Sequence, residues 1–370
     1  MRVREQDLPT AGAEDATLQE ARERAARTAA RALASETFRP HPLFRGGHAQ
    51  TLAAFAWPRR REHLRAHASD EARLFEVEEG VRLLGHCRWQ RGRESCPTLV
   101  LVHGLEGSTT SVYMLSTARL AYEAGFNVVR LNQRNCGATE HLTPTLYHSG
   151  LSGDYRQVVS ELIARDRLAR VFLAGFSMGG NLVLKAAGEW GAGAPRELSG
   201  VCAVSPSINL SVCARAFERR ANRIYQENFM RHLRGRIRRK QRLFPELYDT
   251  RGLRRVRTVR QFDDRYTAPR GGFADADDYY ARSSALPLVA RIRVPTLVVH
   301  AADDPLVPLD AESERALRAN PYVVPVFPRR GGHVAFLSAD ARSRFWAERL
   351  LVEFCRIIDA CGPHGAPTLA

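Results

Sequence analysis

The sequence predicts an α/β protein, with a mostly parallel central sheet covered by helices on both faces and an inserted helical cap. Two observations predict this class. Continuous Val- and Leu-rich runs, typical of strands buried on both faces, alternate with amphipathic helical stretches. One interval of the chain, Pro206 to Ala285, lacks a convincing core strand, and we therefore expect the cap at about residues 206–285.

Composition supports a folded protein. The 370 residues are 44% hydrophobic and 26% charged, which is close to ordinary globular usage and excludes collagenous or wholly disordered chains. No apolar run reaches the roughly 18 residues that a membrane-spanning helix needs. The N-terminus has Asp and Glu throughout and no apolar segment, so we expect no secretory signal there. Seven cysteines without a CxxC pair predict reduced thiols, a cytoplasmic location and no metal site.

The first part of the chain is expected to stand apart from the main domain. Residues 1–37 are rich in Ala, Arg and Glu and have little to bury, so we expect a flexible extension with a helix at about Asp15 to Ala34. Residues 38–370 are expected to form the main domain. Its first segment, Phe38 to Trp57, is apolar and aromatic and should pack on the rest of that domain.

The remaining elements follow the alternating pattern. Glu79-Gly80 is a turn signal between two strand-like runs, Arg73–Glu78 and Val81–Gln90, which predicts a hairpin. The further strands are expected at Thr98–Val102, Asn127–Leu131, Val171–Ala174, Val201–Val204, Thr296–His300 and Val323–Phe327. The helices between and after these strands are expected at about 112–124, 153–165, 178–190, 310–319 and 340–359.

One motif carries chemistry. Gly175-Phe176-Ser177-Met178-Gly179 lies between a predicted strand and a predicted helix, and GxSxG in that context is a nucleophile elbow. The glycines are needed because the sharp turn leaves no room for Cβ atoms beside the serine. The alternative is a glycine-rich turn that only closes a βα unit. We predict that Ser177 is a nucleophile.

A serine needs an oriented base, which follows the serine and the acid in the chain order of this architecture. Four histidines lie downstream of Ser177. His232 lies in the basic cap, His364 in the tail and His300 inside a strand run. His333 follows the last strand in a glycine-containing loop, where an imidazole can reach the sheet edge, and we predict that it is the base.

The acid is expected directly after the preceding strand, where two aspartates compete. Asp304 stands four residues before Pro308, the usual position in D-x-x-V-P loops of related hydrolases. We therefore favour Asp304 as the partner of the base, with Asp303 shaping the loop.

An oxyanion also needs preorganised donors. The backbone N–H of Met178, at the start of the helix after the nucleophile, is one candidate. The backbone N–H of Leu105, in the loop His103–Gly107, is the other, and His103 is expected to brace that loop.

These residues resemble the YheT-like branch of the α/β-hydrolase superfamily, which is related to plant embryogenesis-associated and animal membrane-anchored members. The similarity covers roughly Phe38 to Cys361 and is most specific from Asp263 through Asp304. The matching motifs are Gly272-Phe273, Asp278-Tyr279-Tyr280, Ser284, Ile292, Pro295, Leu297, Val299, Asp303-Asp304, HGLEGS (103–108), Tyr147-His148-Ser149-Gly150 with Asp154, GFSMGGN (175–181) and His48-Ala49-Gln50-Thr51.

The resemblance implies an α/β-hydrolase fold and a charge-relay set of Ser177, Asp304 and His333. It also implies hydrolysis of short- or medium-chain carboxylic esters, or of monoacylglycerol-like lipids. Asn132–Gly137 departs from the Arg-Gly-Cys that relatives usually carry, which bears on the backbone of that loop. The membrane anchor of animal relatives is absent, so we expect the soluble, bacterial type.

The cap is strongly basic. Between Ser211 and Arg260 there are 16 Lys and Arg against 4 Asp and Glu, in a chain whose net charge is +15. Apolar residues recur there at helical spacing, which predicts a lid helix with solvated arginines. A second interpretation is weak contact of this face with an anionic membrane surface. We expect no nucleic-acid binding, because nothing resembles a recognition module. The apolar residues are Phe217, Ala221, Ile224, Tyr225, Phe229, Leu233 and Ile237.

The function predicted from the sequence is therefore a serine esterase that forms an acyl-enzyme on a small-molecule acyl ester and needs no cofactor or metal. The same residues could instead cleave a thioester or amide, or transfer the acyl group to an alcohol. In a different class, the fold could bind lipid or a membrane surface without turnover.

Overall fold

The computed structural model describes residues 11–57, 70–341 and 344–361, and within them eight strands form one sheet in the order β1-β2-β4-β3-β5-β6-β7-β8. The pairs β1–β2 and β2–β4 are antiparallel, and the other neighbours are parallel. The strands are β1 Glu71–Glu78, β2 Val81–Arg88, β3 Thr98–Val102, β4 Asn127–Leu131, β5 Val171–Phe176, β6 Leu198–Val204, β7 Thr296–Val299 and β8 Val323–Val326.

The predicted α/β class, with its mostly parallel sheet, is confirmed. The bounds of β3 and β4 agree with the predicted runs, and both are short, wholly buried segments. The hairpin of β1 and β2 turns at Glu79-Gly80 as expected, and Gly80 takes a φ of 71°, which glycine adopts without strain. Strand β6 begins three residues earlier than predicted, at Leu198, which is itself fully buried.

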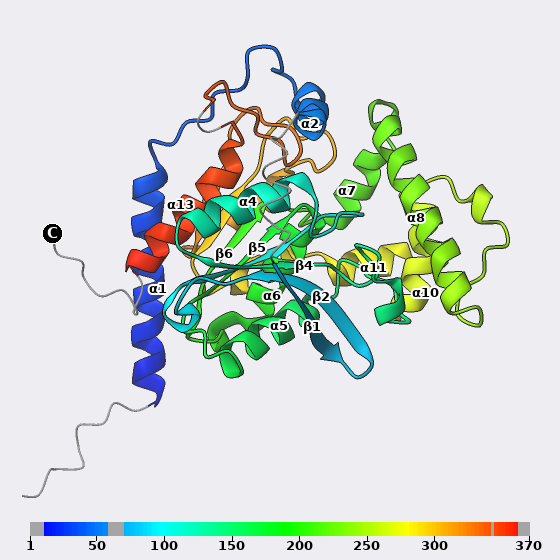
Figure 1. Ribbon diagram of the computed structural model, residues 1–370. Coiled ribbons are helices and arrows are strands. Elements are labelled where there is room, and N and C mark those ends of the chain that lie inside the picture. Colours follow the sequence, from blue (N-terminus) through cyan, green and yellow to red (C-terminus); the bar gives the residue numbers. More distant parts are fainter. Residues whose placement is uncertain (1–10, 58–69, 342–343, 362–370) are drawn as a thin grey trace, which may run out of the picture.

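Helices cover both faces of the sheet (Figure 1). Along β5 the side chains alternate between two apolar cores: Leu173 lies in the core with α5 and α6, whereas Phe172 and Ala174 lie in the core with α1, α4 and α13. This alternation follows from the two-residue period of a strand. The layer helices are α1 Ala11–Leu33, α4 Val112–Glu123, α5 Ser152–Ala164, α6 Met178–Trp190, α12 Ala311–Ala319 and α13 Trp346–Cys361.

The N-terminal segment differs from the prediction. Residues 11–33 form the expected helix, but α1 packs along α13, beside which it lies in Figure 1, and is not a flexible extension. Its contact face is made of small side chains, with Ala26 and Ala29 buried, which lets the two helices approach closely. Arg22 of α1 also donates to the carbonyl oxygens of Pro195 at 2.6 Å and Leu198 at 3.2 Å. This face was not recognised in the sequence because alanines give only a weak hydrophobic pattern. Residues 1–10 lie outside the described residues.

Two segments flank the edge of the sheet that carries the site. Helix α2 Gly47–Ala56 packs on the main domain as expected, since the Gln50 amide donates to Leu337 O at 3.1 Å and accepts from Leu337 N at 2.7 Å. Helix α13 begins at Trp346 and not near residue 340, because Leu337 first forms a bridge with Phe345.

The segment between β6 and β7 is helical and lies at one side of the sheet (Figure 1). Its two ends meet where Leu286 N donates to Ile208 O at 3.0 Å, so it is an insertion into the sheet domain. The expected long amphipathic helix is divided, because residues 218–222 separate α7 from α8. The cap elements are α7 Leu210–Phe217, α8 Arg223–Leu243, α9 Val259–Phe262, a π-helical turn Asp263–Thr267, α10 Ala268–Gly271 and α11 Ala276–Ser283.

In the described ranges, no helix is both long and apolar enough to cross a membrane.

Candidate active site

The predicted elbow is formed at the carboxyl end of β5. Ser177 links β5 to α6 with a φ of 54° and a ψ of −118°. A Cβ on Gly175 would lie 2.1 Å from the carbonyl oxygen of Gly179, and a Cβ on Gly179 would lie 2.4 Å from that of Val102. Both glycines of the motif are therefore required by sterics, and the turn presents Ser177 at the edge of the sheet.

The structure brings the three predicted side chains into one hydrogen-bonded chain. His333 Nε2 lies 2.9 Å from Ser177 Oγ, and His333 Nδ1 lies 2.8 Å from Asp304 Oδ2. These distances suit a serine hydroxyl that donates to the imidazole while the other ring nitrogen donates to the carboxylate. Each residue follows a different strand: Ser177 follows β5, Asp304 follows β7 and His333 follows β8. The carboxyl ends of parallel strands thus converge on one site.

Asp304 is held as an acceptor. Its Oδ1 accepts from the backbone N–H groups of Leu306 and Val307, both at 2.9 Å. Burial by itself raises the pKa of the Asp304 carboxyl, but the His333 imidazole and the Val307 amide lower it, and the net shift is downward. The carboxylate therefore stays ionised where it faces the imidazole.

The other aspartate has the loop-shaping position expected for it. Asp303 Oδ1 accepts from Gly332 N at 2.9 Å, directly before the histidine. The histidine loop is held from a third side by helix α2, where Thr51 Oγ1 accepts from His333 N at 2.9 Å. We assigned no role to Thr51 from the sequence, although it belongs to the HAQT motif. Thr51 is far from the triad in sequence, and only the fold shows this contact.

The loop after β3 runs directly beside the serine. A Cβ on Gly104 would lie 3.0 Å from Ser177 Cβ, and both oxyanion candidates, Leu105 and Met178, line the cavity at Ser177. His103 braces this loop as expected: its Nδ1 donates to Gly104 O at 2.7 Å, and its Nε2 accepts from the backbone of Gln133 at 3.1 Å. Burial lowers the pKa of His103 to about 4, so the ring stays neutral.

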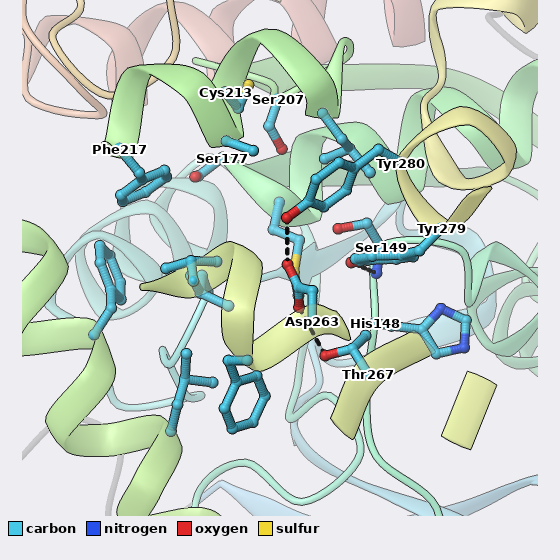
Figure 2. A pocket seen from close by; sticks show the side chains of 18 of the residues that line it. His148, Ser149, Ser177, Ser207, Cys213, Phe217, Asp263, Thr267, Tyr279 and Tyr280 are labelled. Carbon is cyan, nitrogen blue, oxygen red and sulfur yellow. Dashed lines mark hydrogen bonds between the residues drawn. The ribbon is translucent and has the colours of Figure 1, made fainter. Parts of the chain in front are cut away.

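The cavity lies between the sheet edge and the cap (Figure 2). Apolar side chains from the cap form much of its wall, among them Phe217, Phe229 and Leu233. These belong to the apolar stripe that the sequence predicted for a lid. His300, the rival histidine, is buried at a strand end, with its Nε2 2.7 Å from Val307 O.

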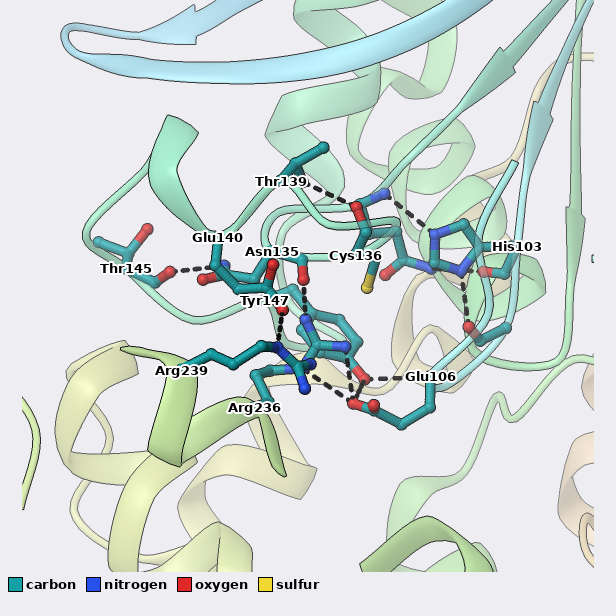
Figure 3. Close-up of polar contacts among 12 residues, drawn as sticks. His103, Glu106, Asn135, Cys136, Thr139, Glu140, Thr145, Tyr147, Arg236 and Arg239 are labelled. Atoms are coloured by element: carbon teal, nitrogen blue, oxygen red, sulfur yellow. Dashed lines mark hydrogen bonds and ion pairs between the residues drawn. The ribbon is translucent and has the colours of Figure 1, made fainter. Parts of the chain in front are cut away.

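A buried ion pair joins the cap to the loop after β3 (Figure 3). Arg236 of α8 donates through Nε to Glu106 Oε1 at 3.0 Å, and it also donates to the carbonyl oxygen of Asn135. The Tyr147 hydroxyl donates to Glu106 Oε1 at 2.7 Å and accepts from Glu106 N at 3.1 Å. Glu106 has a φ of 56° and directly follows Leu105. The ion pair therefore holds the backbone that carries one oxyanion candidate.

Arg236 was not predicted from the sequence because it is one of many cap arginines. The position of Arg236 could have predicted its burial, since it lies on the same helical face as Met230, Leu233 and Ile237. All four residues are buried. A cation inside an apolar stripe predicts a buried partner.

We expect Arg236→Met to lower the free energy of unfolding by about 3 kcal/mol, because it leaves the Glu106 carboxylate buried without its cation. Urea denaturation monitored by circular dichroism measures this loss. The matched control is Arg238→Met, on the same helix but exposed, which should stay close to wild type. Equal stability of the two variants would contradict the assigned ion pair.

The chain is similar in sequence to known proteins of one family. The model of the alpha/beta hydrolase family matches residues 99–345. The protein YheT of Escherichia coli (strain K12) is 31% identical over 255 residues, which are 68% of this chain and 74% of that protein. Monoacylglycerol lipase of Saccharomyces cerevisiae is 29% identical over 71% of this chain, and phospholipase ABHD3 of Mus musculus is 29% identical over 73%. The matches span 59% and 65% of those two longer proteins.

Solved structures share the fold at low identity. The Pyrococcus furiosus esterase Pf2001 superposes with a TM-score of 0.51 at 19% identity, over 81% of this chain and 94% of the esterase. Est1E from Butyrivibrio proteoclasticus has a TM-score of 0.50 at 16% identity, over 78% of this chain and 99% of that one.

Proposed function

The chain belongs to the alpha/beta hydrolase family, and we propose that it is a serine hydrolase that cleaves carboxylic esters through an acyl-enzyme. The observation that carries this proposal is the chain of hydrogen bonds from Ser177 through His333 to Asp304 beside an apolar cavity. The names of the yeast and mouse relatives, a monoacylglycerol lipase and a phospholipase, support ester bonds as the target.

In the proposed reaction, Ser177 Oγ attacks the acyl carbonyl carbon while its proton passes to His333 Nε2. Asp304 orients the imidazole and stabilises its protonated form. The backbone N–H groups of Met178 and Leu105 bind the oxygen on which negative charge develops. His333 then gives the proton to the leaving alcohol, and a water molecule releases the acyl group by the same route. His333 carries each proton between Ser177, the leaving alcohol and water, so the scheme requires no cofactor or metal.

We propose short- or medium-chain acyl esters, or monoacylglycerol-like lipids, as substrates. The cap wall is apolar and suits an acyl chain. The same residues could also cleave a thioester or an amide, or transfer the acyl group to an acceptor other than water. Turnover assays with each substrate distinguish these reactions. We propose a reducing compartment such as the cytoplasm, because the seven cysteines include no CxxC pair.

The proposal predicts that wild-type protein forms a single adduct with a fluorophosphonate probe and that Ser177→Ala forms none, because only an activated serine attacks the phosphorus atom. Intact mass spectrometry measures the adduct. The same samples are assayed with nitrophenyl esters of two to sixteen carbons, where Ser177→Ala should lose at least about a thousandfold in kcat. A folded wild-type protein that is not labelled and turns over no ester would support the binding-protein alternative.

The two neighbouring aspartates give a second, matched prediction. Asp304→Asn removes the carboxylate that faces His333 and should lower kcat by about a thousandfold or more. Asp303→Asn keeps an acceptor for the Gly332 amide and should lose less than about tenfold, since that residue only shapes the loop. Steady-state kinetics on a nitrophenyl ester measures both. The reverse order of the two losses would make Asp303 the acid.

A second proposal concerns weak contact with an anionic membrane surface, for which the exposed side chains give specific support. Phe55 of α2 is 80% exposed and Ile224 of α8 is 69% exposed. The two helices meet where His48 stacks on Tyr225 with ring centroids 5.8 Å apart. Exposed arginines such as Arg223 and Arg231 share α8 with Ile224. Apolar and basic groups together suit an anionic lipid surface.

We therefore expect the protein to cosediment with vesicles that contain phosphatidylserine at physiological salt, and to bind neutral vesicles or a DNA duplex far less. Ile224→Ser should weaken vesicle binding severalfold by removing apolar area that enters the lipid. Leu74→Ser is the control, because Leu74 is also exposed but lies on β1, away from the cap. Absence of vesicle binding by the wild type would remove this proposal.

A further inference from the structure

The cap places a carboxylate in the cavity that the proposed reaction does not use. Asp263 begins the π-helical turn that follows α9, and its buried side chain lines the same cavity as Ser177. Thr267 Oγ1 donates to Asp263 Oδ1 at 2.7 Å, and the Tyr280 hydroxyl donates to Asp263 Oδ2 at 2.8 Å. Figure 2 shows both hydroxyls directed at this carboxylate.

Neither partner of Asp263 is a cation. In the part of the chain that the structure describes, no arginine or lysine forms a salt bridge with it, although the cap is rich in arginine. Burial raises the pKa of Asp263 to about 7, so holding a charge here opposes folding. A carboxylate offers about four acceptor positions, and the two hydroxyls use one on each oxygen. The remaining positions suit a hydrogen-bond donor that arrives in the cavity.

The cavity has walls of different chemistry. Phe217 lies on the same side as Ser177 in Figure 2, and Ser149 and Tyr280 lie on the other, with Asp263 between them. Phe229 and Leu233 add further apolar surface. An ester bound at Ser177 also has two parts, an acyl chain and an alcohol. With the acyl chain against apolar side chains, the alcohol faces the polar wall.

We propose that Asp263 accepts a hydrogen bond from a hydroxyl group on the alcohol part of the substrate, so that the preferred substrates are acyl esters of a polyol such as glycerol. This inference rests on the proposed ester hydrolysis and adds the class of alcohol to it. Thr267 and Tyr280 are positioning residues, because their hydroxyls orient the carboxylate. The assays are run at a pH above the pKa of Asp263, where the group is a carboxylate. Hydrogen bonds to an ionised group are the stronger kind, so loss of this one is measurable in specificity.

The test compares three octanoyl esters that share the acyl chain: 1-octanoylglycerol, its isopropylidene ketal with both hydroxyls blocked, and ethyl octanoate. The quantity compared is the ratio of kcat/KM for octanoylglycerol to that for each other ester. Wild type should prefer octanoylglycerol to the ketal by at least about tenfold. Asp263→Asn leaves only a neutral and weaker acceptor for the hydroxyl and should lower both ratios by about three- to tenfold. Asp264→Asn is the matched control, since Asp264 is exposed and its carboxylate accepts a hydrogen bond from Ala276 N.

Each outcome decides the inference. A lowered ratio in Asp263→Asn with wild-type ratios in Asp264→Asn supports it. Equal losses on all three esters make Asp263 structural and overturn it, as does a ketal hydrolysed as fast as the diol. Octanoylcholine is a further arm: a loss in Asp263→Asn confined to this ester overturns the hydroxyl assignment in favour of a cation.

Two further measurements cover a variant that does not fold and a failure of the proposed function. If Asp263→Asn does not fold, Tyr280→Phe, which removes one orienting hydroxyl, should lower the same ratios by a smaller factor, and unchanged ratios overturn the inference. Failure of the proposed function looks different, because the wild type would then hydrolyse none of the esters and take up no fluorophosphonate.

Discussion

Ser177 holds a backbone conformation, with φ 54° and ψ −118°, that costs roughly 1–3 kcal/mol in a residue with a side chain. The surrounding structure must impose it. Ser177 N donates to Val204 O at 2.9 Å, and α6 packs its apolar face into the buried core behind the turn. The parallel sheet therefore does more than bury area: its rigidity holds the serine within reach of residues that arrive from two other strands.

The cap supplies much of the apolar wall of the cavity, which the sheet edge does not provide. The triad, its bracing residues and both oxyanion candidates come from the main domain, whereas much of the apolar wall comes from the cap. Two buried acidic groups have different roles at the boundary of these parts. Glu106 ties α8 to the loop after β3, and Asp263 gives the cavity a polar wall. In the proposed function, the cap therefore selects the substrate and the sheet domain supplies the catalytic residues.

The errors of the sequence analysis have a common cause. The face of α1 is built of alanines, which carry little periodic signal, and only the matching surface of α13 makes it a buried contact. Arg236 and Asp263 were likewise hidden among many charged residues. Burial distinguishes them, and burial depends on which residues from distant segments surround a position.

The sequence by itself determined the class of fold, most strand positions, the elbow, and the identities of Ser177, Asp304 and His333 as the residues that would meet. The strands and the elbow follow from local rules, since strand period and turn sterics act over short distances. The acid and the base follow from the chain order of this architecture. Only the tertiary structure decided that α1 packs on α13 and that Thr51 holds the histidine loop. It also decided that Arg236 is buried with an ionic partner and Asp263 without one. Such features depend on contacts between segments far apart in the chain, which no local pattern encodes.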